Sequence, residues 1–255
     1  MSRVPDLREI PELPEEVIEA ALNGNLVLFV GAGISRLLGM PSWAGMARTQ
    51  LNFLREQGVI NYSELEQIRT LDPKKQLSIA RELAKENRIE LNLSDGLTGS
   101  PEANPVYKLI NDIGCVCVTT NYDKMLQPRY VGAEDGSETA APITRVAKKE
   151  DFLVSHLNKP GTVVHLHGNI DDEDTMVVTT KDYLEHYDNE FVQEFLGELF
   201  SKKTILFLGY GLEEEEILEH ILRRGSAVEN RERKRFTLQG FFFSQYPLYA
   251  MLYNY

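Results

Sequence analysis

NLVLFVGAGIS, from Asn25 to Ser35, joins a short apolar run of β-forming residues to a glycine turn. In a phosphate-binding loop after a buried strand, glycines let the backbone approach a pyrophosphate, and backbone N–H groups supply an anion site. Taken alone, the signal is weak. Arg36 stands where the third glycine of the dinucleotide fingerprint belongs, and no acidic residue ends a second strand about 20 positions further on. A plain glycine turn fits nearly as well.

Four further segments share this apolar, β-type composition: CVCVTT (115–120), TVVHLH (162–167), MVVTT (176–180) and TILFLG (204–209). Several are apolar throughout instead of alternating, which is typical of strands buried on both faces of a parallel sheet. Helical sequence, such as LEEEEILEHILRRG, separates most of them. The pattern predicts an α/β fold, a Rossmann-like parallel sheet with helices on both faces.

The remaining segments predict one domain over residues 1–255. A first helix is expected over 14–23, and Ser42 suits the cap of a helix over 43–57 within a helical insertion at about 36–104. Residues 127–161 are the least regular and predict a loop or lid around the site. Because the sequence ends in apolar, aromatic residues, we expect either the N-terminal part of a longer polypeptide or a partner that covers this edge.

Composition restricts the function classes. Hydrophobic residues make up 42% of the chain and charged residues 26%, and the formal charge of −12 disfavours nucleic-acid binding through bulk electrostatics. The basic run from Arg223 to Arg235 is the local exception, either a solvated surface or a partner contact. The acidic start lacks the apolar core of a signal peptide, and no apolar run approaches the roughly 20 residues of a membrane span. A cytoplasmic protein is expected.

Polar residues follow three of the other predicted strands. TTNYD (119–123) ends one strand, HLHG (165–168) another and GYG (209–211) the last. Ligands of open α/β sheets bind at the carboxyl edge of the strands, so these residues and GAGIS are expected to share one crevice. Each has an ordinary alternative. Asn and Asp favour turns, and the four glutamates 213–216 are typical of a stabilised helix start.

The two histidines of HLHG, His165 and His167, are two positions apart, so alternation in a strand places both on one face. Two histidines suggest a metal, but the sequence supplies no third or fourth ligand, and we expect no metal site. A histidine at a carboxyl edge equally suits a general base near neutral pH.

In this order, GAGIS with Gly39 and Pro41, TTNYD, HLHG and GYG resemble the sirtuin superfamily. The matching pieces cover most of the chain, and the ordered set is far more specific than any single motif. The resemblance implies that Asn121 holds the nicotinamide ribose or the attacking water and that His167, not His165, is the catalytic histidine. The residues it implies for NAD⁺ binding are Gly31, Ala32, Gly33, Ser35, Asp123, Gly209 and Tyr210.

Departures from the sirtuin pattern narrow the activity. Protein-deacylating sirtuins generally carry a zinc module with two C-x-x-C pairs, and Cys115 and Cys117 cannot supply it. Trp43-Ala44 stands where those enzymes have Phe-Arg, and no acyl-peptide-binding segment is evident. The sequence looks instead like the zinc-less sirtuin-like domains of prokaryotic anti-phage defence proteins. Those domains commonly degrade NAD⁺ on infection and are often oligomerised, or fused or bound to a sensor.

The resemblance therefore implies an NAD⁺ hydrolase that releases nicotinamide and ADP-ribose, with NAD⁺ as substrate and without zinc, as the effector of an abortive-infection system. A homo-oligomer, a sensor or a partner protein is expected with it. Two other interpretations share the same nucleotide site. One is a sensor module that binds NAD⁺ or ADP-ribose without catalysis, and the other is an NAD⁺-dependent deacylase or ADP-ribosyl transferase.

Overall fold

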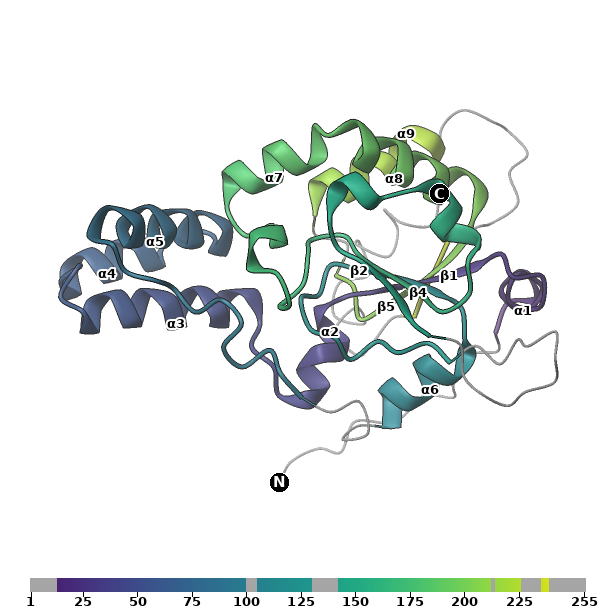
Figure 1. The fold of residues 1–255 in the computed structure, drawn as a ribbon, viewed down its shortest axis with the longest axis horizontal. Helices are drawn as coiled ribbons and strands as arrows, with labels where there is room; N and C mark the ends of the chain where they lie inside the picture. Colours follow the sequence, from purple (N-terminus) through teal and green to yellow (C-terminus); the bar gives the residue numbers. More distant parts are fainter. Residues whose placement is uncertain (1–12, 100–104, 130–141, 212–213, 226–234, 239–255) are drawn as a thin grey trace, which may run out of the picture.

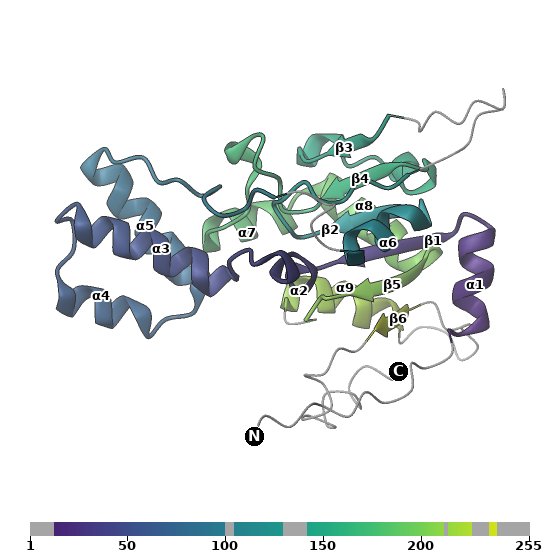
Figure 2. The same ribbon diagram turned by 90° about the horizontal axis from the view of Figure 1, so that it is seen from below.

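The computed structural model describes residues 13–99, 105–129, 142–211, 214–225 and 235–238. Its strands are β1 (Leu26–Val30), β2 (Val116–Thr119), β3 (Thr144–Val146), β4 (Thr162–His165), β5 (Thr204–Leu208) and β6 (Arg235–Leu238). They form one sheet in the order β3-β4-β2-β1-β5-β6, in which all neighbours run parallel (Figures 1 and 2). The prediction of a parallel α/β sheet is confirmed.

Helices cover both faces of this sheet, which is why its strands are apolar throughout. Every residue of β1, β2, β4 and β5 is buried. Phe29 of β1 joins a cluster with Phe195 of α8 (Glu190–Lys202) and Ile217 of α9 (Glu215–Gly225). Leu28, pointing the other way, joins a cluster with Val17 of α1 (Glu15–Leu22) and Tyr107 of α6 (Pro105–Ile113). In Figure 1, α8 and α9 lie above the sheet and α6 below it.

The predicted helical insertion projects from one side of the sheet as a layer of its own (Figures 1 and 2). After the short α2 (Ala32–Ser35) and a 3₁₀ turn, η1 (Arg36–Leu38), it comprises α3 (Trp43–Glu56), α4 (Tyr62–Arg69) and α5 (Pro73–Asn87). As predicted, Ser42 caps α3 by accepting a hydrogen bond from the Gly45 N–H at 3.1 Å.

The segment MVVTT is not the strand that its composition predicted. Met176–Val178 is buried, but Thr179 caps α7 (Thr180–Tyr187) in a capping box with Asp182. The residues are apolar because they pack against the insertion, in a cluster with Met46 of α3. A segment that is buried outside the sheet therefore has the same apolar composition as a buried strand.

Residues 127–161 are only partly irregular. β3 and the 3₁₀ segments η3 (Lys149–Asp151) and η4 (Val154–Asn158) lie in this stretch, so the expectation of a continuous loop or lid is wrong for residues 142–161. Another 3₁₀ turn, η5 (Glu173–Thr175), precedes α7. Residues 130–141 lie outside the described ranges, as do 226–234 of the basic run and the apolar segment after 238. No helix in the described ranges is long and apolar enough to cross a membrane.

Candidate functional site

All four loops that the sequence singled out follow central strands of the sheet. The parallel register aligns Val30 of β1 with Thr119 of β2 and with Leu208 of β5, and Thr119 with His165 of β4. GAGIS, TTNYD, HLHG and GYG therefore leave the sheet at one edge. β2, the next strand along the chain, lies on one side of β1, and β5 lies on the other. The direction in which successive strands are added to the sheet therefore reverses at β1. Such a switch point is where open α/β sheets bind ligands.

The two glycine loops pack directly against each other. The Gly31 N–H donates to the Leu208 carbonyl oxygen at 2.9 Å, and the Gly33 N–H donates to the Gly209 carbonyl oxygen at 2.8 Å. A Cβ on Gly33 would lie 2.7 Å from that same oxygen. These two amides are therefore engaged between the loops, and the role of Gly31 and Gly33 in NAD⁺ binding stays a prediction. The exposed Ala32 and Gly33 line the surface of the edge.

A buried polar network joins three of the predicted site residues, Ser35, Asn121 and Asp123. The Ser35 hydroxyl donates to Asp123 Oδ2 at 2.6 Å and accepts from Asn121 Nδ2 at 2.7 Å. Asn121 Nδ2 also donates to the Gly31 carbonyl oxygen at 3.0 Å. Tyr107 of α6 adds its hydroxyl, 3.1 Å from the Ser35 oxygen. Both hydrogens of the Asn121 amide are thus used to fix its orientation.

The other end of the Asn121 amide is free. Asn121 is 8% exposed, and its Oδ1 is buried without a hydrogen-bond partner among the described residues. A buried carbonyl oxygen without a partner is unfavourable, so the position suits a ligand that brings a donor. Asp123 lies beside it. Burial raises the pKa of Asp123, while hydrogen bonds from Ser35 and the Met125 N–H act in the opposite direction.

The two histidines of HLHG have separate surroundings. Arg145 Nη1 donates to His165 Nε2 at 3.2 Å, which leaves Nδ1 to donate to the Asn121 carbonyl oxygen at 3.1 Å. Burial lowers the pKa of His165 to about 4. His165 is therefore a neutral support for the backbone of Asn121. Strand β4 ends at His165, so strand alternation does not extend to His167. The two histidines contact different residues, so they do not share the face that alternation predicted.

His167 is enclosed by aromatic side chains of α7. Its Nε2 lies 2.8 Å from the Tyr187 hydroxyl and its Nδ1 lies 3.4 Å from the Tyr183 hydroxyl. The His186 ring meets His167 edge to face. Burial, together with His186 and Lys74, lowers the pKa of His167 well below its usual value, so the imidazole is neutral at pH 7.

The backbone at Gly168, directly after His167, requires a glycine. Its φ is +79°, in the left-handed region, and a Cβ there would lie 2.2 Å from the Thr175 carbonyl oxygen. The tight turn lets the Val177 N–H donate to the His167 carbonyl oxygen at 3.0 Å. The loop after β2 is tied to the loop after β4, because the Ile170 N–H donates to the Tyr122 carbonyl oxygen at 3.1 Å. The loops that carry Asn121 and His167 are therefore held together.

Tyr210, predicted to bind the cofactor, is largely a core residue. It is 8% exposed, and its ring centroid lies 4.8 Å from that of Phe29. Its hydroxyl is also buried, and it faces the Glu214 carboxyl group. Gly209 makes the contact with Gly33 described above.

The sequence analysis missed three residues around His167: Tyr183, Tyr187 and Glu214. The two tyrosines are four positions apart, so they lie on one face of α7, a signal the sequence contains. Glu214 was assigned with its neighbours to helix stabilisation. Its Oε2 instead lies 3.7 Å from His167 Nε2. Nothing in the run of glutamates distinguishes Glu214 from its neighbours in the sequence.

Neutral His167 and the oriented Asn121 amide give the edge a proton acceptor and a hydrogen-bond acceptor. Within the described ranges, no three His, Cys, Asp or Glu side chains form a metal-binding group, and Cys115 and Cys117 are both free. The arrangement suits a ligand whose hydroxyl groups are oriented and deprotonated at the sheet edge.

Known proteins align with most of this chain at 25–29% identity. The chain is 25% identical over 218 residues to NAD(+) hydrolase ThsA of Cytobacillus dafuensis, covering 83% of this chain and 40% of that protein. It is 29% identical over 214 residues to NAD(+) hydrolase ThsA of Enterococcus faecium, covering 80% and 40%. It is 26% identical over 212 residues to Defense-associated sirtuin 2 of Bacillus subtilis, covering 80% and 19%. The chain thus spans less than half the length of these curated relatives.

Residues 116–250 match the family described as the SIR2-like domain, a span that begins at β2 and contains TTNYD, HLHG and GYG. The match covers more than half of the chain, and the resemblance that the ordered motifs suggested is confirmed. The chain belongs to the SIR2-like domain family.

Proposed function

We propose that this chain is an NAD⁺ hydrolase that cleaves the bond between nicotinamide and ribose to give nicotinamide and ADP-ribose. The observation that carries the proposal is the buried Oδ1 of Asn121, which has no hydrogen-bond partner in the described part of the chain and whose amide is fixed by Ser35 and Gly31. The relatives named NAD(+) hydrolase support the choice of substrate.

The reaction needs little acid catalysis. The nicotinamide nitrogen of NAD⁺ is cationic and leaves as a neutral base, so the protein must stabilise an oxocarbenium-like ribose, as in glycoside cleavage. It must also position water and limit access of bulk solvent. Asn121 Oδ1 accepts a hydrogen bond from a ribose hydroxyl or from the attacking water. His167, neutral at pH 7, accepts the proton that one of these oxygens loses.

Nicotinamide release from NAD⁺, measured by chromatography, tests the proposal. Asn121→Ala removes the acceptor and His167→Ala removes the base, so each is expected to lower turnover by roughly 10² or more. Asn87→Ala, at the exposed end of α5, and His156→Ala, on η4, are matched controls outside the sheet edge and should keep the wild-type rate. Near-normal turnover in Asn121→Ala would contradict the assignment.

The same experiment separates the alternative functions. NAD⁺ or ADP-ribose binding by calorimetry without nicotinamide release would indicate a sensor module. Nicotinamide release that depends on an acetyl-lysine peptide would indicate a deacylase. Neither release nor binding would mean that the SIR2-like fold serves another purpose here.

We further propose that the hydrolase is the effector of an anti-phage system and that it acts as an oligomer or with a sensor protein. The relative named Defense-associated sirtuin 2 supports this role. Bacteria that express the wild-type chain within its full-length protein should lose NAD⁺ on infection and yield fewer phage. Cells that express Asn121→Ala should do neither.

A further inference from the structure

Glu214 stands at the start of α9, directly opposite His167. Its Oε2 lies 3.7 Å from His167 Nε2, the ring nitrogen that also contacts the Tyr187 hydroxyl at 2.8 Å. The two residues are 47 positions apart in the sequence, His167 in the turn after β4 and Glu214 directly before α9. The carboxyl group therefore faces one defined nitrogen of the histidine that we propose as the base.

This carboxyl group is placed where water has little access. The Glu214 side chain is 19% exposed, and the oxygen nearest His167, Oε2, is buried without a hydrogen-bond partner among the described residues. The neighbouring glutamate, Glu215, is exposed on the same helix. Burying a carboxyl group is unfavourable for folding, and the polar groups that face this one are the His167 imidazole and the hydroxyls of Tyr187 and Tyr210.

The other nitrogen of His167 is the less engaged one. Nδ1 lies 3.4 Å from the Tyr183 hydroxyl, a longer contact than the one at Nε2. The Tyr183 ring stacks on Trp43, which follows the GAGIS and Pro41 segment of the cofactor loop, with ring centroids 5.5 Å apart. Nδ1 thus faces Tyr183, whose ring connects it to Trp43 at the start of α3.

We propose that Glu214 is the positioning residue of His167. Its carboxylate keeps the imidazole hydrogen on Nε2, which leaves the Nδ1 lone pair as the base. When a ribose hydroxyl or water gives its proton to Nδ1, the ring becomes a cation, and the Glu214 anion balances its charge. The proton returns to solvent after the products leave. This inference rests on the proposed hydrolase function, and it follows the logic by which an acidic residue orients a catalytic histidine.

The pairing of Glu214 with His167 requires an ionised carboxylate, so it depends on pH. Burial raises the pKa of Glu214 to about 7, and the neighbouring Glu216 acts in the same direction, whereas the Tyr210 hydroxyl, Lys74 and the Tyr187 hydroxyl lower it. Burial keeps the pKa of His167 well below 6.5, outside this range. The titratable and charged groups facing the pair come from α5, the turn after β2, α7, the turn after β5 and α9: they are Lys74, Tyr122, Tyr183, His186, Tyr187, Tyr210 and Glu216.

A pH profile of nicotinamide release tests the proposal. Wild-type turnover should fall as the pH drops below about 7, because protonated Glu214 no longer balances the imidazolium charge. Glu214→Gln should lower turnover on the order of 10²-fold at pH 8. Its turnover should also no longer show the fall that the wild type shows below about pH 7. Glu214→Asp, which restores the charge, should recover part of the rate. Glu215→Gln is the matched control and should keep the wild-type profile. A wild-type rate and limb in Glu214→Gln would overturn the inference and leave the hydrolase function intact.

A second measurement does not depend on catalysis. Nitrogen-15 NMR of histidine-labelled protein, assigned with His167→Ala, reports which ring nitrogen carries hydrogen. The His167 signals should show hydrogen on Nε2 at pH 8 and should shift near pH 7 as Glu214 titrates, and Glu214→Gln should abolish that shift. Hydrogen on Nδ1, or no shift near pH 7, would overturn the inference even if the wild-type chain released no nicotinamide. A wild-type chain that releases no nicotinamide but shows the expected His167 signals would contradict the proposed function and leave the inference about Glu214 intact.

Discussion

Gly33 shows how a single missing side chain sets the geometry of the candidate site. Its backbone lies against Gly209, and the hydrogen bond between them holds the loop after β1 to the loop after β5. The sequence presented these glycines as phosphate-binding positions. The structure shows that two of their amides are used between the loops, so their first role is to allow the close approach.

Gly33→Ala should therefore damage both stability and activity. The added Cβ would lie 2.7 Å from the Gly209 carbonyl oxygen and 2.9 Å from its Cα, so the loops must separate. We expect a loss of about 1–3 kcal/mol in the free energy of unfolding and a strong fall in nicotinamide release. Chemical denaturation and turnover measure the two effects.

Gly24→Ala is the matched control for that substitution. Gly24 follows α1, has a φ of +65°, and has no other atom within 4 Å of an added Cβ. It should lose about 1–2 kcal/mol from the left-handed backbone alone and keep its turnover. Equal turnover in both variants would show that the contact between the glycine loops does not shape the site.

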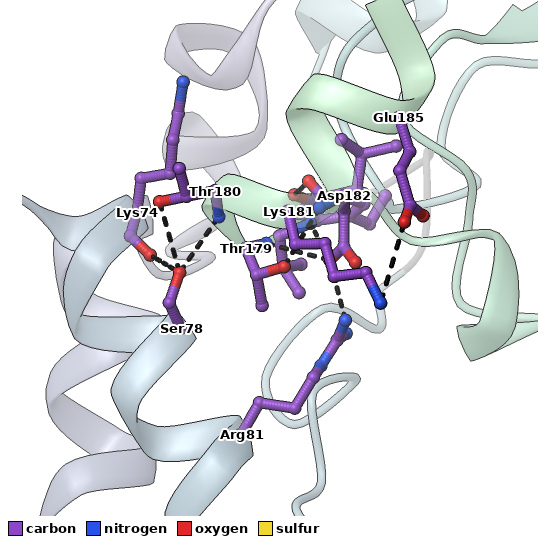
Figure 3. Close-up of polar contacts among 11 residues, drawn as sticks. Lys74, Ser78, Arg81, Thr179, Thr180, Lys181, Asp182 and Glu185 are labelled. Carbon is purple, nitrogen blue, oxygen red and sulfur yellow. Dashed lines mark hydrogen bonds and ion pairs between the residues drawn. The ribbon is translucent and has the colours of Figure 1, made fainter. Parts of the chain in front are cut away.

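At the scale of elements, the insertion is attached to the site through α5 and α7 (Figure 3). Arg81 of α5 donates to Asp182 Oδ2 at 2.7 Å, and the same oxygen accepts from the Thr179 N–H at 2.9 Å in the capping box of α7. Ser78 of α5 accepts a hydrogen bond from the Thr180 N–H at 2.9 Å. Because α7 also carries the two tyrosines that contact His167, the insertion supports the first turn of the helix that encloses the proposed base.

Arg81→Gln should loosen this support. Asp182 would keep its capping role but lose its ion pair to the insertion, which we expect to lower the free energy of unfolding by about 1 kcal/mol. Nicotinamide release should fall several-fold as α7 shifts relative to His167. Thermal unfolding and turnover check the two expectations.

Lys181→Gln tests whether that effect belongs to the link between elements. Lys181 pairs with Glu185 at 3.6 Å inside α7, and its side chain is 80% exposed (Figure 3). Such a surface pair contributes about 0–0.5 kcal/mol, so stability and turnover should be unchanged. A similar loss of activity in both variants would argue against a specific role for the contact between α5 and α7.

At the scale of the whole molecule, buried titratable groups of opposite type couple folding to pH. Burial lowers the pKa of His165 and of His186 to about 4. Because these folded values lie below the usual 6.5, the histidines stabilise the fold above that pH and lose this contribution as the pH falls. Glu214 behaves in the opposite way. Its pKa is raised from 4.5 to about 7, so its contribution is present at low pH and is lost as the pH rises through 7.

Glu214→Gln should therefore change the pH dependence of stability. Without the opposing carboxyl group, the variant should lose stability more steeply than the wild type between pH 7 and 4.5, the interval between the two pKa values of Glu214. Above pH 7 it should be the more stable protein, because it no longer buries a carboxylate. Melting temperatures at several pH values check both. Parallel curves would show that Glu214 is not titrating in this range.

Much of the fold could be predicted because burial on two faces leaves a local trace. Apolar runs identified β1, β2, β4 and β5, and the glycine and polar residues at their ends identified the edge that they share. Other elements gave no such trace. β3 and β6 lie at the sheet edges, and the short, mixed TRV of β3 carries little apolar signal. MVVTT carried the signal without being a strand, because packing against the insertion demands the same residues as pairing in a sheet.

The sequence by itself determined the parallel sheet, the helical insertion, the family, and the loops that hold Asn121 and His167. Each of these can be recognised from short runs of consecutive residues. Only the tertiary structure decided which side chains meet there. Ser35 and Asp123 are 88 positions apart, and Glu214 is 47 positions from His167, so their contacts depend on how distant elements pack. The same packing turned Glu214 inward and occupied the amides of Gly31 and Gly33. Local sequence specifies burial and turns, whereas hydrogen bonds and pKa values depend on neighbours that only the folded chain brings together.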